Sequence, residues 1–539
     1  MGQIMAANPI WWRDGVVYQI YPRSFADSNG DGIGDLEGVI QHLDYLAELG
    51  IEAVWFSPFY PSPDVDFGYD VSNYTDIDPK FGSLADFDRL VAESHKRGIR
   101  VVLDLVLNHT SDQHPWFQES RKGNDNPYSD WYIWRDAKPD GSLPNNWEAI
   151  FGTPGWEWDA KRGQYYYHMF YPQQPDLNWR NPQVRKACLG VVRFWLERGV
   201  DGFRLDVFSN FFKHPDLPDN PPAVGLRAFD RQKHIYDSNQ PDMIPLLREL
   251  RELLDSYPER YAVGETFMPT PQRVAAYTAP GLIHAAFDFE MLHCRWDPDC
   301  FQKAILATEE AMHPDSWPVY TLNNHDTSRS ASRFHCGNND ERLKVAAALT
   351  ITLRGTPFIY YGEEIGMRNI HVPRRFIQDR IGEKYWPIFD GRDKNRSPMQ
   401  WNDSSHAGFT TGKPWLPVHP DHKTRNVEAQ RKDPRSLFHF YRRLIQLRKE
   451  LSALRGGLFQ PVTYNPRKLL AYLRQDSYQS VLVVLNFSRR PVRLAMGGEL
   501  RRNGWALALS NKRDTLPAIE KGGYLSLLGD EVMILTERS

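Results

Sequence analysis

Gly202-Phe203-Arg204-Leu205-Asp206-Val207 is the stretch of sequence from which the fold of this chain can be predicted. The surrounding run 200–206 is short and nearly continuously apolar, which is typical of a buried strand in a parallel sheet. Apolar side chains at helical spacing in 183–198 predict a helix that leads into this strand. Arg204 precedes Asp206 by two residues, so it lies on the same face of the strand and favours the ionised carboxylate. Such a carboxylate at the end of a barrel strand can act as a nucleophile, although the pair alone fits a structural ion pair equally well.

Helix and strand alternate along most of the chain. Further helices are predicted at 36–49, 84–97 and 244–257, and further strands at 16–21, 51–57, 99–105, 261–265, 319–322 and 357–361. About eight such units favour a closed barrel over an open doubly wound sheet. No Gly-rich phosphate-binding motif follows the first strand, which disfavours a dinucleotide-binding fold. We therefore expect an α/β protein built on a (β/α)8 TIM barrel.

Two irregular stretches interrupt this alternation. The first follows the third strand, is rich in Pro, Asn, Gly, Trp and Tyr, and is too long for a connecting loop, so it predicts an inserted subdomain. The second spans 368–427. From about residue 458 the apolar pattern changes to a period of two, which predicts a C-terminal antiparallel β-sandwich. The expected domains are the first part of the barrel, the inserted subdomain, the second part of the barrel and the C-terminal β domain: 1–107, 108–176, 177–457 and 458–539.

The composition is that of an ordinary globular protein, with 41% hydrophobic residues, 25% charged residues and a net charge of −3 over 539 residues. Acidic and basic residues are interspersed, so neither nucleic acid nor an anionic membrane surface is an expected partner. No run of about 20 apolar residues is present, so no membrane span is expected. The first twelve residues lack the basic and apolar regions of a secretory signal. We expect a cytoplasmic monomer or homodimer.

The chain has four cysteines, and their spacing is not that of a metal site: Cys188, Cys294, Cys300 and Cys336. So few cysteines in so long a chain do not make a disulfide scaffold. Cys294 and Cys300 could form a bridge, but free buried thiols are the expectation for all four.

The segment Asp27-Ser-Asn29-Gly-Asp31-Gly-Ile33-Gly-Asp35 has oxygen side chains at alternate positions and glycines at the turn, as Ca²⁺ loops do. It departs from the EF-hand because its twelfth position is Gly38 and supplies no bidentate Glu. The alternative is a surface turn without a metal. We expect one structural divalent cation, with Ca²⁺ favoured over Mg²⁺, and no organic cofactor. The expected ligands are four side chains and the backbone carbonyl of Ile33: Asp27, Asn29, Asp31, Ile33 and Asp35.

Polar residues stand at the ends of four predicted strands. They are Asp104, Asn108 and His109 at and after the end of strand 99–105, Arg204 and Asp206 at the end of 200–206, Glu265 at the end of 261–265, and Asn323, Asn324, His325 and Asp326 after 319–322. Each group alone could cap the following helix. Because the carboxyl ends of barrel strands meet at one rim, together they predict an active site there.

These four segments resemble the four signature regions of glycoside hydrolase family 13, the α-amylase family. The resemblance covers nearly the whole chain and includes the segments Asp66-Phe-Gly-Tyr69-Asp70 and Gly391-Arg392-Asp393. Within the family, the loop 27–35 and the stretch 395–401 are most similar to the α-glucosidase and oligo-1,6-glucosidase branch. The resemblance implies a barrel with an inserted domain, a β domain at the C-terminus and a retaining mechanism.

The resemblance also implies roles for three carboxyl groups. A retaining glycosidase uses two carboxyl groups about 5 Å apart, one as nucleophile and one as acid and base. Asp206 is the implied nucleophile. Glu265 is the implied acid/base, in a poorly solvated setting that would raise its pKa. Asp326 is the implied third carboxylate, which binds sugar hydroxyls and stabilises the oxocarbenium-like transition state.

Further residues are implied to form a pocket for one terminal glucose. His109 and His325 would hydrogen-bond its hydroxyls, and Arg204 would orient the nucleophile. The remaining residues would grip the far hydroxyls, stack on the ring or line the rim: Asp66 and Arg392, Tyr69, and Phe151 and Phe170. A closed pocket implies action on a non-reducing end. Asp70, Asn108 and Asp104 are expected to be scaffold.

Three functions remain open at this point. An exo-acting α-glucosidase of short oligosaccharides or disaccharides is favoured. A glucosyl-transferring isomerase of sucrose or trehalose type would use the same residues. A catalytically inactive scaffold homologue is disfavoured, because all three carboxylates are present and no membrane span is found. Val207, next to the nucleophile, suggests α-1,6 preference, since Val accompanies that linkage in this branch; the alternative is that Val207 is ordinary core packing.

Overall fold

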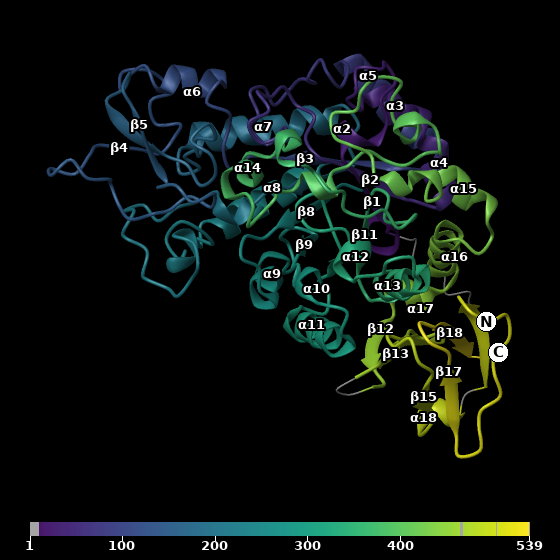
Figure 1. The fold of residues 1–539 in the computed structure, drawn as a ribbon. Coiled ribbons are helices and arrows are strands. Elements are labelled where there is room, and N and C mark those ends of the chain that lie inside the picture. Colours follow the sequence, from purple (N-terminus) through teal and green to yellow (C-terminus); the bar gives the residue numbers. More distant parts are fainter. Residues whose placement is uncertain (1–9, 464–466, 503, 538–539) are drawn as a thin grey trace.

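The computed structural model describes residues 10–463, 467–502 and 504–537. Eight parallel strands close into a barrel in the order β1-β11-β10-β9-β8-β7-β3-β2, which confirms the predicted fold class (Figure 1). The strands are β1 (Val17–Ile20), β2 (Ala53–Phe56), β3 (Arg100–Leu105), β7 (Gly202–Leu205), β8 (Tyr261–Glu265), β9 (Ala285–Phe287), β10 (Val319–Thr321) and β11 (Thr356–Tyr360). The outer ends of the two terminal predicted domains, 1–9 and 538–539, lie outside the described residues.

The barrel interior is filled by side chains from successive strands, so it is a packed core and not a pore. Trp55 from β2, Tyr261 and Val263 from β8, Phe287 from β9 and Phe358 from β11 form one buried cluster there. The strand β9 was not predicted. Its three residues, Ala-Ala-Phe, are too short to produce a period in the sequence.

Helices surround the barrel and present their apolar faces to it. The longer ones are α5 (Leu84–Lys96), α7 (Pro182–Glu197), α8 (Met243–Asp255), α11 (Pro298–Ala311), α13 (Asp340–Thr352) and α16 (Leu437–Glu450). The shorter ones are α1 (Trp11–Asp14), α2 (Pro22–Phe25), α3 (Leu36–Gln41), α4 (Leu43–Leu49), α9 (Pro271–Tyr277), α10 (Glu290–His293), α12 (Ser330–Arg333), α14 (Arg380–Tyr385), α15 (Val427–Lys432) and α17 (Ser452–Gly456). The helix α7 begins where the Asn181 side chain accepts from the Gln183 N–H and Pro182 takes the first position. The single helix predicted at 36–49 is two helices, because the backbone leaves helical geometry at His42.

The segment between β3 and α7 folds beside the barrel, on the left in Figure 1. It contains α6 (Pro115–Ser120) and a three-stranded sheet in the order β4-β6-β5, with bounds Trp134–Arg135, Gln164–Tyr167 and Trp156–Asp159. A second cluster joins this segment to the loops after β7 and β8, since Trp147 and Tyr167 are buried with Phe229 and Phe267. The barrel loops and the inserted segment therefore share one apolar core.

The last part of the chain forms two antiparallel sheets. One has the order β12-β13-β14-β18-β16 and the other pairs β15 with β17. Their bounds are β12 (Leu458–Pro461), β13 (Leu469–Gln475), β14 (Ser480–Asn486), β15 (Val492–Ala495), β16 (Trp505–Ser510), β17 (Tyr524–Leu527) and β18 (Val532–Glu537), and α18 (Glu499–Arg502) lies among them. Leu482, Leu494 and Leu527 belong to one buried cluster between the sheets. Arg474, on β13, donates to the carbonyl of Thr352 at the end of α13 and so ties this domain to the barrel.

No helix in the described ranges is long and apolar enough to cross a membrane.

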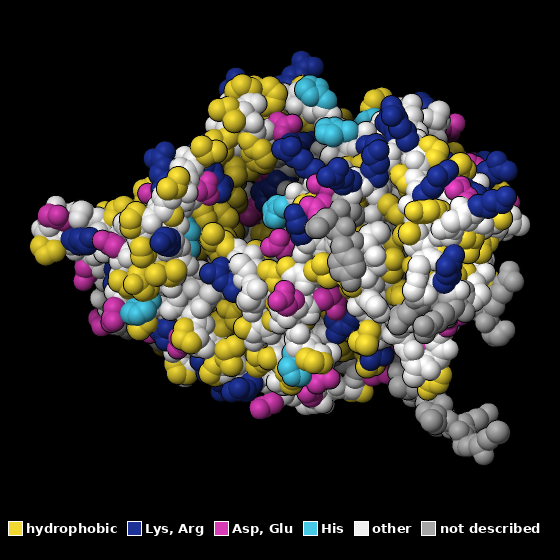
Figure 2. Space-filling model, turned by 90° about the horizontal axis from the view of Figure 1, so that it is seen from below, with side chains coloured by type: hydrophobic (Ala, Val, Ile, Leu, Met, Phe, Trp, Pro, Cys, Tyr) yellow, Lys and Arg dark blue, Asp and Glu magenta, His cyan; other side chains and the backbone are white. Residues whose placement is uncertain are grey.

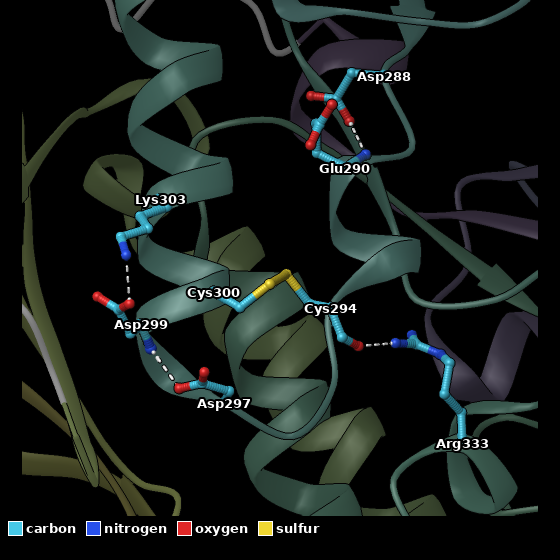
Figure 3. The surroundings of a disulfide bond; sticks show 8 residues. All are labelled: Asp288, Glu290, Cys294, Asp297, Asp299, Cys300, Lys303 and Arg333. Atoms are coloured by element: carbon cyan, nitrogen blue, oxygen red, sulfur yellow. Dashed lines mark hydrogen bonds and ion pairs between the residues drawn. A yellow bond between two sulfur atoms is a disulfide. The ribbon is translucent and has the colours of Figure 1, made fainter. Parts of the chain in front are cut away.

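The expectation of four free thiols is wrong for two of them. Cys294 and Cys300 form a disulfide (Figure 3), while Cys188 and Cys336 are free and buried. The bridge forms because α10 ends just before Cys294 and α11 starts at Pro298, so the turn between them brings the two Cα atoms to 5.7 Å. Arg333 donates to the Cys294 carbonyl and holds the turn from the other side.

Candidate active site

The polar residues predicted from the strand ends lie together at one end of the barrel. Asp104 is the last residue but one of β3, Asp206 directly follows β7, and Glu265 is the last residue of β8. His325 and Asp326 follow β10 after a short turn. The space-filling view shows a hollow in which acidic, basic and histidine side chains gather beside hydrophobic ones (Figure 2).

One buried guanidinium holds three carboxylates. Arg204 Nη1 donates to Asp104 Oδ1 and to Asp206 Oδ1 at 2.6 Å each, and Arg204 Nη2 donates to Glu265 Oε2. Arg204 is 2% exposed and lies 5.3 Å from the centre of the Trp55 ring, so these contacts are screened from water. Asp206 and Glu265 are therefore close neighbours on the same cation.

Arg204 lowers the pKa of Asp206, as the sequence suggested, but this effect is smaller than the opposing effect of burial. Burial is the larger effect and raises the pKa of Asp206 well above its usual value, and the charges of Glu265 and Asp104 add to the rise. One guanidinium is shared by three carboxylates, so it does not fully offset the negative charges of Glu265 and Asp104 at Asp206. Ionisation of Asp206 is thus less favourable than the sequence argument implied.

The third carboxylate has the opposite environment. Asp326 Oδ1 accepts from Arg396 Nη2 at 2.8 Å and from Arg392 Nη1 at 3.2 Å, and its Oδ2 lies 3.1 Å from His325 Nε2. Burial opposes ionisation of Asp326, but the adjacent His325 and the two arginine charges outweigh it and hold the pKa well below its usual value. Asp326 therefore stays negatively charged.

His325 is fixed by contacts at both ring nitrogens. Gln19 Nε2 lies 2.8 Å from His325 Nδ1 and, as an amide nitrogen, can only donate. His325 Nε2 faces Tyr69 Oη at 2.7 Å. Tyr69 Oη in turn donates to Asp104 Oδ2 at 3.0 Å, and its ring is parallel to His325 at 5.4 Å. Tyr69 and His325 form one rigid wall of the site.

A second wall comes from the β3 end and the inserted segment. Gln174 Nε2 lies 3.1 Å from His109 Nε2 and 3.3 Å from Asp66 Oδ2. Burial lowers the pKa of His109, and Asp176 partly opposes that effect. Beneath them Lys213 Nζ donates to Asp176 Oδ2 at 2.5 Å and to Asn108 Oδ1 at 3.0 Å.

Asp66 and Arg392 close one side of the site. Arg392 Nη2 donates to Asp66 Oδ1 at 2.8 Å, and the guanidinium is held from behind by both oxygens of Asp379 at 3.0 Å. The aromatic residues predicted for the rim lie next to these walls: Phe170 is 5.0 Å from His109, and Phe151 is 5.9 Å from the Arg392 guanidinium.

Sequence reasoning missed four residues that shape the site: Gln19, Gln174, Asp379 and Arg396. Arg396 lies in the stretch 395–401 that was noted for its resemblance, and its cationic side chain was a usable signal. The two glutamines gave none, because their partners are distant in the chain. Asp379 binds Arg392, which follows it by 13 residues in the irregular stretch 368–427, where no helix or strand period relates the two. Asp70 and Asp104 were expected to be scaffold; Asp70 accepts from the backbone N–H groups of Val65 and Asp66, while Asp104 binds Arg204 directly.

The loop 27–35 is a series of tight turns. Asp27, Asn29 and Asp31 each accept from the backbone N–H two residues further on, at 3.0, 2.9 and 2.8 Å. Asp35 instead accepts from the Gly38 N–H and so caps α3. Ile33 lies between Asp31 and Asp35 in the loop. Among the residues that the structure describes, no group of three or more His, Cys, Asp or Glu side chains is arranged to hold a metal ion. Any cation in this loop would also need Asn29 and backbone carbonyls.

Comparison with known proteins gives concordant matches over the chain. Residues 19–457 match the family described as "Alpha amylase, catalytic domain", and residues 459–529 match "Maltogenic Amylase, C-terminal domain". A probable alpha-glucosidase of Rhizobium meliloti is 45% identical over 89% of both chains. An oligo-1,6-glucosidase of Parageobacillus thermoglucosidasius is 43% identical over 89% of this chain and 91% of the relative. The crystal structure of an alpha-glucosyl transfer enzyme, XgtA, covers 98% of this chain and 100% of its own with a TM-score of 0.93 and 42% identity. With its barrel, its grouped strand-end carboxylates and these matches, the chain belongs to the α-amylase family of glycoside hydrolases.

Proposed function

We propose that this protein is a retaining, exo-acting α-glucosidase that releases terminal non-reducing α-linked glucose from short oligosaccharides or disaccharides. The observation that carries the proposal is the pair Asp206 and Glu265, held side by side on the Arg204 guanidinium at the carboxyl end of the barrel. Retaining glycosidases need two carboxyl groups that lie close together, about 5 Å apart. The names of the relatives agree with this activity.

The reaction follows from the charges of the site. Asp206 attacks the anomeric carbon and forms a β-glucosyl ester, while Glu265 gives its proton to the departing glycosidic oxygen. Water then attacks the ester, Glu265 takes a proton from that water, and α-glucose and free Asp206 result. Asp326, held ionised by its arginines, stabilises the positive charge that develops on the sugar ring.

Exo-action is supported by the pair Asp66 and Arg392. Their 2.8 Å ion pair lies across the side of the site opposite the leaving group, where an internal glucose would need room for the next sugar. In the proposed complex these residues bind the outer hydroxyls of the terminal glucose. Tyr69, His109 and His325 contact its remaining faces.

The linkage preference that we propose is α-1,6. Val207 follows the nucleophile directly, its N–H lies 3.4 Å from Glu265 Oε2, and its backbone has φ = +33°. This strained position is unusual for a β-branched residue and places Val207 beside the acid/base rather than in regular strand packing.

A glucosyl-transferring enzyme is the second candidate, and the similarity to an alpha-glucosyl transfer enzyme favours it. It would use the same residues and pass the glucosyl ester to a sugar hydroxyl instead of water. Relative kcat/KM on maltose, isomaltose, sucrose and trehalose, with product analysis, separates the two. Release of free glucose supports the hydrolase, and an isomeric disaccharide as the main product overturns it.

We also propose that loop 27–35 binds one Ca²⁺. Three carboxylates stand within nine residues, and none of them pairs with a Lys or Arg side chain in the ion pairs of the described part of the chain. All the side-chain donors are oxygens, which suits Ca²⁺. The ligands would be Asp27, Asn29, Asp31, the Ile33 carbonyl and Asp35, with a structural role.

A further inference from the structure

A turn of the inserted segment, 149–153, is held from outside by side chains of α14. Lys384 Nζ donates to the carbonyl oxygens of Phe151 at 2.9 Å and Gly152 at 3.1 Å. Tyr385 Oη donates to the same Phe151 carbonyl at 3.1 Å. In Figure 1, α14 lies on the side of the barrel that faces the inserted segment. Two neighbouring side chains thus bind the main chain of a loop more than 200 positions away in sequence.

The fit between the turn and α14 is close. Gly152 has φ = +77°, and a Cβ atom at this position would lie 2.2 Å from Tyr385 Oη. A larger residue therefore could not keep this contact. From the loop after β7, Arg227 Nη1 donates to the carbonyl of Ile150 at 3.4 Å. The turn is held from two directions.

The turn carries an aromatic side chain into the active site. The Phe151 ring packs on Tyr171 with a centroid distance of 4.3 Å and lies 5.9 Å from the Arg392 guanidinium. It is also 6.0 Å from Phe170, which itself lies on His109. Phe151 therefore covers the residues that close the far side of the proposed glucose pocket.

We infer that Lys384 and Tyr385 are specificity-determining positioning residues, which lock the turn 149–153 so that Phe151 closes the pocket behind the terminal glucose. The inference rests on the proposed function and deepens it. With these hydrogen bonds in place, Phe151 fills the space beside Arg392, and only a chain end can enter the pocket. Without them, Phe151 loses its fixed main chain, and a further sugar can occupy the space behind the cleaved residue.

The experiment compares the unmodified protein with the double variant Lys384→Met, Tyr385→Phe, which keeps the size of both side chains and removes the donors. The probes are isomaltose, isomaltoheptaose and an isomaltoheptaoside whose non-reducing-end 4- and 6-hydroxyls carry an ethylidene block. The unmodified protein should release glucose from the first two and leave the blocked substrate intact. The double variant should cleave the blocked substrate at least tenfold faster than background. Its KM for isomaltose should rise severalfold, while kcat changes less than twofold.

Lys423→Met is the matched control, because Lys423 Nζ also donates to a backbone carbonyl in an exposed part of the same barrel segment, that of Asp403 at 2.6 Å. It should behave like the unmodified protein in all three assays. If the double variant leaves the blocked substrate uncleaved and keeps the ratio of kcat/KM for isomaltoheptaose and isomaltose, the positioning role of Lys384 and Tyr385 is overturned while the proposed function stands. If the unmodified protein releases glucose from neither unblocked substrate, the proposed function fails, and the positioning role fails with it.

Discussion

Arg396 Nη2 lies 2.8 Å from Asp326 Oδ1, and this contact links the irregular segment after β11 to the catalytic end of β10. Because the arginine charges help to hold the pKa of Asp326 below its usual value, Asp326 remains ionised as the pH falls. Arg396→Gln should raise the pKa of Asp326 toward its usual value and move the acid limb of kcat/KM to higher pH. Arg396→Lys keeps the charge and should move that limb less. If the acid limb of kcat/KM falls at the same pH in the Gln variant and in the unmodified protein, Asp326 does not set that limb.

Asp206→Asn should abolish turnover without loss of folding. Removal of the nucleophile should lower kcat to less than about a hundredth, a cost of several kcal/mol in the barrier. Because Asp206 adds to the crowding of carboxylates around Arg204, its neutral replacement should leave Tm unchanged or higher. Asp216→Asn, an exposed change in the loop after β7, is the control. A kcat above that hundredth in the Asp206 variant contradicts the assignment of the nucleophile.

Val207→Thr should move the substrate preference from isomaltose toward maltose. One altered contact beside the leaving group is worth roughly 1–3 kcal/mol, which is about ten- to two-hundredfold in relative kcat/KM. The measurement is the ratio of kcat/KM values on the two disaccharides. A ratio that shifts by less than severalfold identifies Val207 as packing without an influence on linkage.

Chelation should lower Tm if the loop 27–35 holds Ca²⁺, because an ion bound only by the folded state stabilises it by mass action. Added Ca²⁺ should restore Tm, and kcat measured well below Tm should change little. Asp31→Ala removes one exposed proposed ligand and should reduce the effect of the chelator. An identical Tm with chelator and with excess Ca²⁺ would argue against the site.

Cys300→Ser should destabilise the protein modestly. The disulfide closes a short loop, with a sequence separation of 6, and a loop of that size is expected to contribute about 2 kcal/mol through the entropy of the unfolded chain. Tm should fall in the variant, and a reducing agent should lower the Tm of the unmodified protein by a similar amount. The free Cys336 provides the control, since Cys336→Ser should leave the sensitivity to reducing agent unchanged.

The barrel could be predicted from sequence because most of its strands are near-continuous apolar runs between amphipathic helices. The strand β9 could not be predicted, because a strand of three residues is too short to show an apolar pattern. The disulfide escaped for a different reason. Whether Cys294 and Cys300 meet depends on the turn between α10 and α11, which composition does not reveal.

Part of the site could be located in the same way, since residues that end barrel strands must gather at one rim. Asp206 and Glu265 follow that rule. The raised pKa of Asp206 could not be predicted in this way, because it depends on the burial of the site and on the contact of Arg204 with Asp104, which only the folded structure shows. Gln19 and Gln174 show the same limit: an amide that orients a histidine has no sequence pattern of its own.

The C-terminal sheets are tied to the end of α13 by Arg474 and lie at the lower right of Figure 1, whereas α14 and the inserted segment lie toward the upper left. A carrier matrix or fusion partner joined to the outer sheet of β15 and β17 would therefore stand away from the sugar-binding end. Immobilised in this orientation, the enzyme should keep the KM that it has free in solution, whereas attachment through the lysines of the 373–394 segment should raise it.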